Sequence, residues 1–545
     1  MDASSISSNT SRRPWLALAV VLFATFMDIL DTHIVSVAIP RIQEDLNGSY
    51  AAGQWCIAGY ALSFALVLVI GGRLGDMFGR KRIFLVGVTG FAACSLLCVL
   101  APSMGVLIGA RVMQGAFAGL MAPQVLAVIQ VLFPPERRKV AFVAFGVTLN
   151  LAQVSAPILG GVLATYDLAG LHWRAIFLIN IPLGLLTVLG ALLYVPESRS
   201  DQRMRFDLVG MVLIALVSAF LMYPLQQGRE LGWPVWMLVM LVVAIPLAAV
   251  FARYERRRSE DAALVPASLV RRRSFAAGTL VYLVLFSGTI SAFLIVIWNV
   301  QFALGWSPIR TAITMLGWVT GILVTAPLAV KFGDNHGRTL VGTGCGLLTV
   351  GTVVMSSVVR VQADQLTSPQ LFGCFVLMGT GMGLLSPILI SLVLAEVPPR
   401  DAGAASGITN AVMQFGAAAG VGVVGLIFFS LVARGADAES GRVAPGLRAE
   451  LASTDLAPST SDQIVADFRR CFGDRAGAVN PDVVPGSCRA ASLQEPAARR
   501  AVEPFERSAT TRNWADATAN TLWYQVFVFL VALVFTRALP KGTAG

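Results

Sequence analysis

The chain has 545 residues, of which 56% are hydrophobic and 13% are charged, and its formal net charge is +10. Soluble domains carry about 25% charged residues, and a mean hydropathy of +0.72 means more apolar surface than a soluble core can cover. The basic residues lie between apolar stretches and form no single patch, which argues against a nucleic-acid-binding protein. The composition therefore predicts an integral membrane protein in a lipid bilayer.

Fourteen apolar segments are long enough to cross a bilayer, which takes about 20 residues. In chain order they are 15–39, 55–72, 83–100, 106–132, 140–164, 175–195, 208–225, 235–251, 276–302, 309–330, 339–358, 371–394, 404–432 and 521–539. Only helices and closed barrels satisfy the backbone in lipid, and these segments lack the alternation of barrel strands. We predict an all-α polytopic membrane protein with 14 transmembrane helices.

The charges between the segments predict an orientation. With the N-terminus in the cytoplasm, Lys and Arg gather in the inside segments and are scarce in the short outside loops, as the positive-inside rule requires. An even number of spans returns the C-terminus to the same side. We therefore expect a multi-pass protein of the cell (plasma or inner) membrane with both termini cytoplasmic.

An internal repeat relates the first six spans to the last six. The sequence LGDMFGR at 74–80 matches FGDNHGR at 332–338, and FPPERR at 133–138 matches VPPRDA at 397–402. Both matches follow a span on the predicted inner side, at offsets of 258 and 264 residues. The repeat predicts two pseudo-symmetric six-helix bundles with two inserted helices, an architecture that suits alternating access around a central cavity.

The repeat and the spans divide the chain into five regions. These are a six-helix bundle at 1–200, the inserted helices and a linker at 201–274, helices 9–13 at 275–432, an extracytoplasmic loop at 433–515, and helix 14 with a cytoplasmic tail at 516–545. The loop is polar, so a disordered spacer would suffice, although 464–472 has the pattern of a short amphipathic helix. Cys471 and Cys488 are candidates for a disulfide in an oxidising exterior.

Several motifs in the expected order resemble the major facilitator superfamily, and specifically its fourteen-spanner drug:proton antiporter branch of the quaternary-ammonium and multidrug resistance type. They are GRLGDMFGRK at 72–81, LDTHIVSVAIP at 30–40, RVMQG at 111–115, APILGG at 156–161 and WRAIFLINIPLG at 173–184. The resemblance covers nearly the whole chain except 433–515. It implies a transporter driven by a proton gradient.

Asp28 and Asp31 are carboxylates deep in the first span, near the middle of the membrane. An ionised carboxylate there costs at least about 2.5–3.5 kcal/mol, so such acids are candidates for binding and releasing protons. Residues three positions apart share a helix face. Arg111, a basic residue inside the fourth span, lies at a depth comparable with Asp31, and the two are predicted to pair. The alternative is that these acids form structural contacts with neighbouring helices.

The 72–81 motif predicts a cytoplasmic gate. Asp76 is positioned to accept hydrogen bonds from the N-terminus of the helix that Asp401 and Gly403 open, where the backbone N–H groups and the helix dipole favour an anion. Arg80 would orient Asp76, and the motif's glycines allow a tight turn and close approach. The predicted gate residues are Gly72, Asp76, Gly79, Arg80, Lys81 and Asp401. The alternative is an ordinary basic inside loop.

Other residues are weaker candidates. The resemblance implies that Pro157, Gly160 and Gly161 form an antiporter motif in the fifth helix, acting as a hinge or seal, although a kinked packing helix would look the same. Polar groups that are candidates for a substrate cavity are His33, Gln114, Asn150, Gln153, Trp298, Asn299, Asn410 and Gln414.

The sequence argues against enzymatic or ATP-driven function. It contains no G-x-x-x-x-G-K-[ST] loop, no metal-ligand cluster and no nucleophile elbow, so we expect no catalytic residue, no metal and no cofactor. The favoured function is proton-coupled export of small hydrophobic drugs or metabolites by a monomer. Proton-coupled import of a small nutrient and a transporter-like sensor remain alternatives, and APILGG favours export because the family associates that motif with antiporters.

Overall fold

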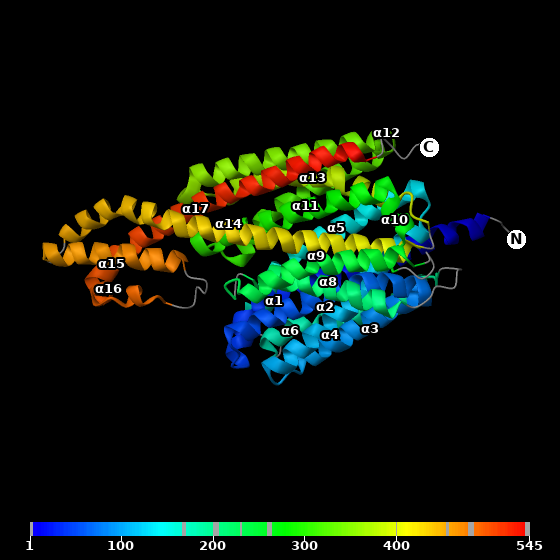
Figure 1. Cartoon of the computed structure of the whole chain (residues 1–545), viewed down its shortest axis with the longest axis horizontal. Coiled ribbons are helices and arrows are strands. Elements are labelled where there is room, and N and C mark those ends of the chain that lie inside the picture. Colours follow the sequence, from blue (N-terminus) through cyan, green and yellow to red (C-terminus); the bar gives the residue numbers. More distant parts are fainter. Residues whose placement is uncertain are drawn as a thin grey trace.

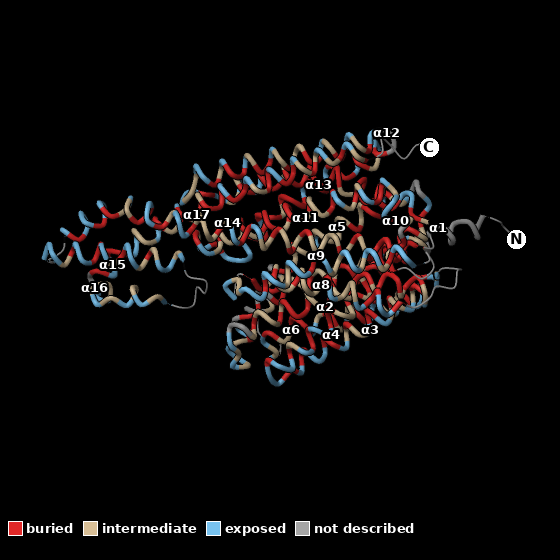
Figure 2. The backbone as a smooth tube through the Cα atoms, viewed as in Figure 1, coloured by how far each residue is buried: buried red, intermediate tan, exposed pale blue. Residues whose placement is uncertain are grey.

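The computed structural model describes residues 4–165, 170–199, 207–228, 231–258, 264–398, 401–453, 457–477 and 484–539. Within these ranges fourteen helices are long and apolar enough to cross a membrane, which confirms the predicted all-helical, fourteen-span architecture. Buried residues concentrate in the centre of the bundle, and exposed ones cover its outside (Figure 2). The large apolar side chains that remain exposed on the spans suit contact with lipid.

Most of the N-terminal half forms the lower bundle in Figure 1. This half contains α1 (Ser4–Asp45), α2 (Tyr50–Phe78), α3 (Arg80–Val99), α4 (Met104–Leu132), α5 (Pro135–Thr165), η1 (His172–Arg174), α6 (Ala175–Leu178) and α7 (Asn180–Tyr194). Of these helices, α5 lies higher in the view, against helices of the C-terminal half. The span predicted at 175–195 is therefore divided between α6 and α7. Ser49 and Ser103 cap α2 and α4 by accepting hydrogen bonds from backbone N–H groups of their first turns.

Two helices inserted between the halves are α8 (Leu208–Gln227) and α9 (Val235–Arg256). α8 packs against α2 of the N-terminal half and α14 of the C-terminal half, and α9 packs on α8. Met222 of α8 is buried between Ala65 of α2 and Ala418 of α14. The inserted pair therefore touches both halves.

The C-terminal half forms the upper bundle in Figure 1. It contains α10 (Ala267–Arg271), α11 (Arg273–Trp298), η2 (Asn299–Ala303), α12 (Pro308–Gln362), η3 (Ala363–Gln365), α13 (Ser368–Leu394), α14 (Ala402–Ala452), α15 (Pro458–Gly477), η5 (Gly486–Arg489), α16 (Ala491–Gln494), α17 (Pro496–Phe535) and η6 (Thr536–Ala538). α12 carries the two spans predicted at 309–330 and 339–358, which join at a kink where His336 leaves helical geometry.

α1 begins and α17 ends at one end of the bundle, which we call the terminal face, and α15 and α16 project from the opposite end, the distal face (Figure 1). Gly79 separates α2 from α3 at the terminal face with a φ of 106°, a conformation that favours glycine. Its N–H donates to the carbonyl oxygen of Gly75 at 3.0 Å.

Residues 433–515, which we call the distal domain, are largely helical where the structure describes them. α14 has 51 residues, about 76 Å at 1.5 Å per residue, so it continues far beyond a bilayer about 30 Å thick. The expected boundaries at 432–433 and 515–516 fall inside α14 and α17, and the helix expected at 464–472 is part of α15. Side chains from α14, α15 and α17 pack into a separate apolar core, so this region is a small helical domain and not a spacer.

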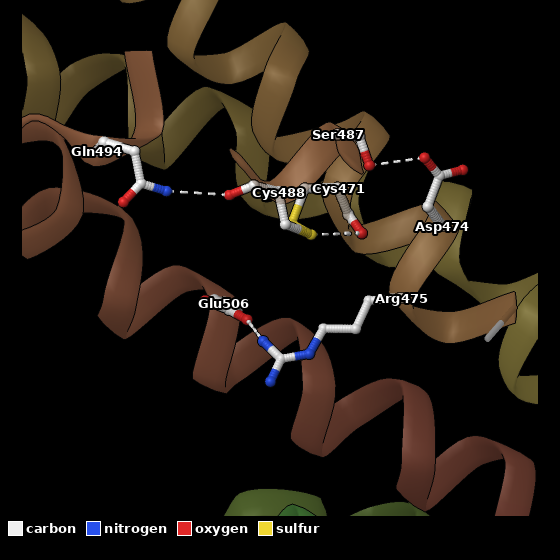
Figure 3. The surroundings of a disulfide bond; sticks show 7 residues. All are labelled: Cys471, Asp474, Arg475, Ser487, Cys488, Gln494 and Glu506. Carbon is white, nitrogen blue, oxygen red and sulfur yellow. Dashed lines mark hydrogen bonds and ion pairs between the residues drawn. A yellow bond between two sulfur atoms is a disulfide. The ribbon is translucent and has the colours of Figure 1, made fainter. Parts of the chain in front are cut away.

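A disulfide links Cys471 of α15 to Cys488 of η5, as the sequence suggested (Figure 3). Around it, Arg475 forms an ion pair with Glu506 of α17 at 2.7 Å. Ser487 donates to Asp474 at 2.6 Å. These contacts tie α15 and η5 to each other and α15 to α17.

Candidate transport site

A cavity of about 260 Å³ lies in the centre of the molecule between the two halves. Helices α1, α2, α4 and α5 line one side, and α11, α12, α13 and α14 line the other. Its aromatic lining residues are Tyr60, Phe64, Phe142, Phe145, Tyr282, Phe286, Phe293 and Trp318. Its polar lining residues are Thr25, Asp28, Thr32, His33, Asn150, Gln153, Thr289, Ser386, Asn410 and Gln414. Such a lining suits a flat aromatic molecule that carries a few hydrogen-bonding groups.

Asp28 supplies the carboxylate of this lining. It lies on α1 and is 5% exposed. The hydroxyl of Tyr60 on α2 donates a hydrogen bond to Asp28 Oδ1. Asp28 is therefore positioned to bind a cavity ligand or a proton. Its carboxylate already accepts one hydrogen bond, from Tyr60.

Asp31 lies one turn further along α1 but is absent from the cavity lining. It is fully buried and forms an ion pair with Arg111 of α4. Asn180 of α7 donates to Asp31 Oδ1 at 2.6 Å, and Gln114 donates to the same oxygen at 3.2 Å. A buried ion pair offsets its desolvation only when such extra hydrogen bonds are present.

Arg111 is held from three directions. Its Nη1 also donates to Gln114 Oε1 at 2.7 Å, and its Nε donates to the carbonyl oxygen of Cys56 on α2 at 3.2 Å. Its guanidinium carbon lies 4.2 Å from the ring centroid of Tyr60. The predicted pairing of Arg111 with Asp31 is therefore present, and Tyr60 lies between this pair and Asp28.

Asp76 connects the two halves at the terminal face. Its Oδ1 accepts from the N–H of Gly403 at 3.0 Å and its Oδ2 from the N–H of Ala404 at 2.9 Å, at the N-terminus of α14. Arg80 donates to Asp76 Oδ1 at 2.6 Å. An anion at a helix N-terminus meets free N–H groups and the positive end of the dipole. This is the contact that the sequence predicted for Asp76.

The two halves approach closely around this contact. A Cβ atom on Gly72 would lie 2.2 Å from the carbonyl oxygen of Gly403, so glycine is required at this crossing. Gln130 of α4 donates to the carbonyl oxygens of Leu394 and Val397, both at 3.1 Å. These hydrogen bonds join the two halves at the terminal face.

Comparison with known proteins identifies the chain. The family model described as Major Facilitator Superfamily matches residues 21–421. The chain belongs to this superfamily. It is therefore a multi-pass membrane transporter of small molecules and not an enzyme, and the resemblance read from the motifs is confirmed.

Its relatives in this superfamily include exporters and resistance proteins. The chain is 39% identical to a probable actinorhodin transporter of Streptomyces coelicolor over 531 residues, covering 97% of this chain and 92% of that protein. It is 34% identical to a puromycin resistance protein of Streptomyces alboniger, covering 76% and 82% of the two chains. It is 31% identical to a tetracenomycin C resistance and export protein of Streptomyces glaucescens, covering 78% of each chain. The chain is thus similar to a transporter, a resistance protein and a resistance and export protein.

A solved structure of a human organic anion transporter shares the fold. It aligns with a TM-score of 0.56 at 15% identity and covers 76% of this chain and 94% of that chain. At this identity the similarity concerns the fold alone.

The transporter brings many of the sequence-predicted residues together. His33, Asn150, Gln153, Asn410 and Gln414 line the cavity beside Asp28. Gln114 lies outside the lining and hydrogen-bonds Asp31 instead.

Two predicted cavity residues lie elsewhere. Trp298 and Asn299 are not among the lining residues. Trp298 packs against the rings of Phe428 and Phe429, with centroids 5.8 and 5.1 Å apart, and Asn299 is buried in η2. Trp298 is the last residue of α11 and Asn299 is the first of η2, so both lie on the distal side of the α11 residues that line the cavity.

The remaining predicted gate and hinge residues have mixed placements. Lys81 donates through Nζ to the carbonyl oxygen of Leu192 at 2.9 Å, so its contact stays within the N-terminal half. Asp401 is buried at the start of α14. In α5, Gly160 is buried, but the side chain of Pro157 and the surroundings of Gly161 lie outside the described part of the chain.

Sequence reasoning missed three residues that complete the site. Tyr60 joins Asp28 to Arg111, and Asn180 donates to Asp31. Trp318 of α12 donates through Nε1 to Asn150 of α5 and so connects the halves at the cavity. Asn180 lies within the WRAIFLINIPLG motif, where a polar residue in an apolar run was a usable signal. Tyr60 and Trp318 gave no such signal, because an aromatic side chain in an apolar span can face either lipid or a cavity.

The C-terminal half has a neutral counterpart of the Asp31 cluster. Ser291 of α11 lies 260 residues after Asp31, between the two offsets of the repeat. Its hydroxyl and the amide of Gln525 on α17 form a hydrogen bond of 3.1 Å. Equivalent helices are thus joined in both halves, by Asp31 with Asn180 and by Ser291 with Gln525. Of these four residues only Asp31 is ionisable.

Proposed function

We propose that the transporter exports small, hydrophobic, aromatic compounds in exchange for protons by alternating access. One observation carries the proposal: a carboxylate in the cavity, Asp28, lies beside a buried ion pair, Asp31 with Arg111, through their common neighbour Tyr60. A ligand in the cavity and a proton on either acid would change the same local charge balance. The names of the relatives, which include an actinorhodin transporter and a tetracenomycin C export protein, support export of a small drug-like molecule.

The closed terminal face indicates which stage of the transport cycle this conformation represents. The Lys and Arg distribution supports a cytoplasmic terminal face and cytoplasmic termini in the plasma membrane. With the terminal face closed by Asp76 on α14, the conformation corresponds to the stage at which the cavity has lost access to the cytoplasm. Protonation from the outside would then favour the return to an inward-open state. The proton gradient would be the energy source, with no cofactor, and the monomer would be the working unit.

Transport into inverted membrane vesicles tests the proposal. Two planar aromatic probes, the cation ethidium and the neutral hydroxyanthraquinone alizarin, should accumulate when the vesicle interior is acidified and should leave when the gradient is collapsed. Asp31→Asn should abolish the gradient-driven part of this transport. Ser291→Ala, at the equivalent position of the other half, should retain it, and both variants should be present in the membrane in equal amounts.

Two outcomes would reject the proposal. Gradient-driven movement of the probes in the opposite direction would identify an importer. Undiminished accumulation by Asp31→Asn would show that protons act elsewhere.

A further inference from the structure

Tyr60 is the one side chain among the described residues that both lines the cavity and stacks on Arg111. Its hydroxyl donates to Asp28, and its ring lies under the Arg111 guanidinium at 4.2 Å. The side chain is 2% exposed. A single phenol therefore touches the cavity acid at one end and the partner of Asp31 along its face.

Close packing of α2 on α4 fixes this geometry. A Cβ atom on Gly115, one turn after Arg111, would lie 2.2 Å from the carbonyl oxygen of Tyr60. Arg111 also donates to the carbonyl oxygen of Cys56, one turn before Tyr60. The ring of Phe64 lies nearly parallel to that of Tyr60, at 6.1 Å between centroids. The Tyr60 ring has little room to move without moving the guanidinium.

The chemistry of the two contacts links their states. A phenol hydroxyl that donates to an ionised carboxylate stabilises its charge. The hydrogen bond weakens when the carboxylate takes a proton or accepts from a donor group of a ligand. The ring's contact with Arg111 depends on the ring's position and electron density. A change at Asp28 therefore alters the strength of the Arg111–Asp31 ion pair. By linkage, a change in that ion pair alters the affinity of Asp28 for its ligand.

We propose that Tyr60 is a positioning residue that couples occupancy of Asp28 by substrate to the strength of the Arg111–Asp31 ion pair. The inference rests on the proposed function, since it assigns the route by which substrate and proton sense each other. Removing the Tyr60 hydroxyl should leave both sites occupied by their ligands but make them independent.

The cavity offers a matched control. Tyr282 of α11 also lines it and is 2% exposed. Its hydroxyl donates to the carbonyl oxygen of Ser386 at 3.5 Å, and its ring lies 5.9 Å from that of Phe286. Tyr282→Phe removes a cavity hydroxyl of the same kind that donates to a neutral carbonyl oxygen.

The test measures coupling and binding on the purified full-length transporter, using whichever of ethidium and alizarin the wild type exports. The first readout is the dissociation constant of the probe over a series of pH values. The second is the number of protons released into weak buffer when the probe is added. Coupling free energies between sites typically change affinity by about 5- to 150-fold, so the pH dependence of wild-type affinity should fall about fivefold or more in Tyr60→Phe. Tyr282→Phe should change affinity without changing its pH dependence.

A double-mutant cycle tests the route. In an Asp28→Asn background, Tyr60→Phe should cause no further loss of pH dependence, because the two residues act through one contact. Wild-type pH dependence and proton release in Tyr60→Phe, or additive effects in the double variant, would overturn the role of Tyr60. The vesicle experiment above keeps the proposed function separate. If the wild type accumulates the probe under a proton gradient while Tyr60→Phe keeps wild-type pH dependence, the proposed function stands and the role of Tyr60 falls.

Discussion

In the N-terminal half, α1 presents Asp31 to Asn180 of α7, and in the C-terminal half, α11 presents Ser291 to Gln525 of α17. The same pair of helices meets in both halves, but one contact includes a buried ion pair and the other is neutral. The difference indicates that the repeat preserves the packing of helices more strictly than their chemistry. Proton handling can then reside in one half, while the other supplies a neutral cavity wall and the helix N-terminus that Asp76 binds.

The halves also differ at the distal face. In the N-terminal half, a short connection joins α5 to η1, whereas the distal domain joins α14 to α17 in the C-terminal half. Its apolar core and disulfide make it a unit of its own outside the part of the chain that matches the family model. We expect changes in this domain to affect transport less than changes in the charged cluster of the other half.

The largest effect is expected from Arg111→Ala. It leaves Asp31 buried without its cation, and breaking a buried pair destabilises a protein by about 3–5 kcal/mol. Because Asp31 is the proposed proton site, gradient-driven transport should fall to the background of vesicles that lack the transporter. Arg111→Lys should not restore it, because an ammonium cannot reach Asp31, Gln114 and the Cys56 carbonyl at once. The measurement is probe accumulation in vesicles. Gln525→Ala, in the neutral counterpart, is the control, and an equal loss there would remove the proposed asymmetry between the halves.

Loss of the disulfide should destabilise the distal domain alone. The bridge closes a loop of 17 residues, and for loops of about 15 residues the chain-entropy estimate is near 3 kcal/mol. In Cys471→Ser, amide exchange in α15 should therefore accelerate strongly while exchange in α2 and α4 stays unchanged. Adding a reductant should reproduce the effect in the wild type and add nothing in the variant. Acceleration throughout the membrane helices would mean that the domain supports the whole fold.

Asp76→Asn tests the contact between the halves at the terminal face. Hydrogen bonds to charged groups contribute about 1.5–3 kcal/mol, so removing the charge should shift the equilibrium roughly 10- to 100-fold toward opening of this face. Reaction of a single cysteine placed at the closed crossing with a soluble thiol reagent reports the shift. Lys81→Ala is the control, because Lys81 forms hydrogen bonds with Glu197 and Leu192 of the N-terminal half. Equal reactivity in wild type and Asp76→Asn would argue against a latch.

The fold was largely predictable from the sequence, because lipid demands long apolar helices and the described residues contain fourteen candidate spans, as predicted. The ends of α14 and α17 were not predictable in this way. Hydropathy marks where a helix leaves the membrane, and α14 continues through Gly441 and Pro445 because the distal domain packs around it.

The site was partly predictable. Depth along two spans was enough to pair Asp31 with Arg111, and the repeat was enough to direct Asp76 to the N-terminus of α14. Tyr60 and Trp318 required knowledge of how the helices are rotated, which depends on tertiary packing such as the contact of Gly115 with the Tyr60 backbone. Trp298 was misplaced for a different reason: it ends α11 on the distal side of the cavity, and the sequence carries no measure of how deep the cavity lies.

The smallest effect is expected at Asp45, where the N-terminal half ties the end of α1 to η1 at the distal face. Hydrogen bonds from Trp173 at 2.9 Å and Arg174 at 2.7 Å hold the pKa of Asp45 below its ordinary value. A depressed pKa contributes stability above the unfolded pKa of about 3.9, and that contribution is lost as the pH falls through the lower folded value. Because the ion pair is exposed, it contributes about 0–1 kcal/mol.

Asp45→Asn should therefore lower the melting temperature slightly at neutral pH, and the difference from wild type should vanish in strong acid. Asp516→Asn, which removes an exposed carboxylate 3.9 Å from Arg360 in the C-terminal half, is the comparison, and a difference at Asp45 that grows as the pH falls would contradict the assignment.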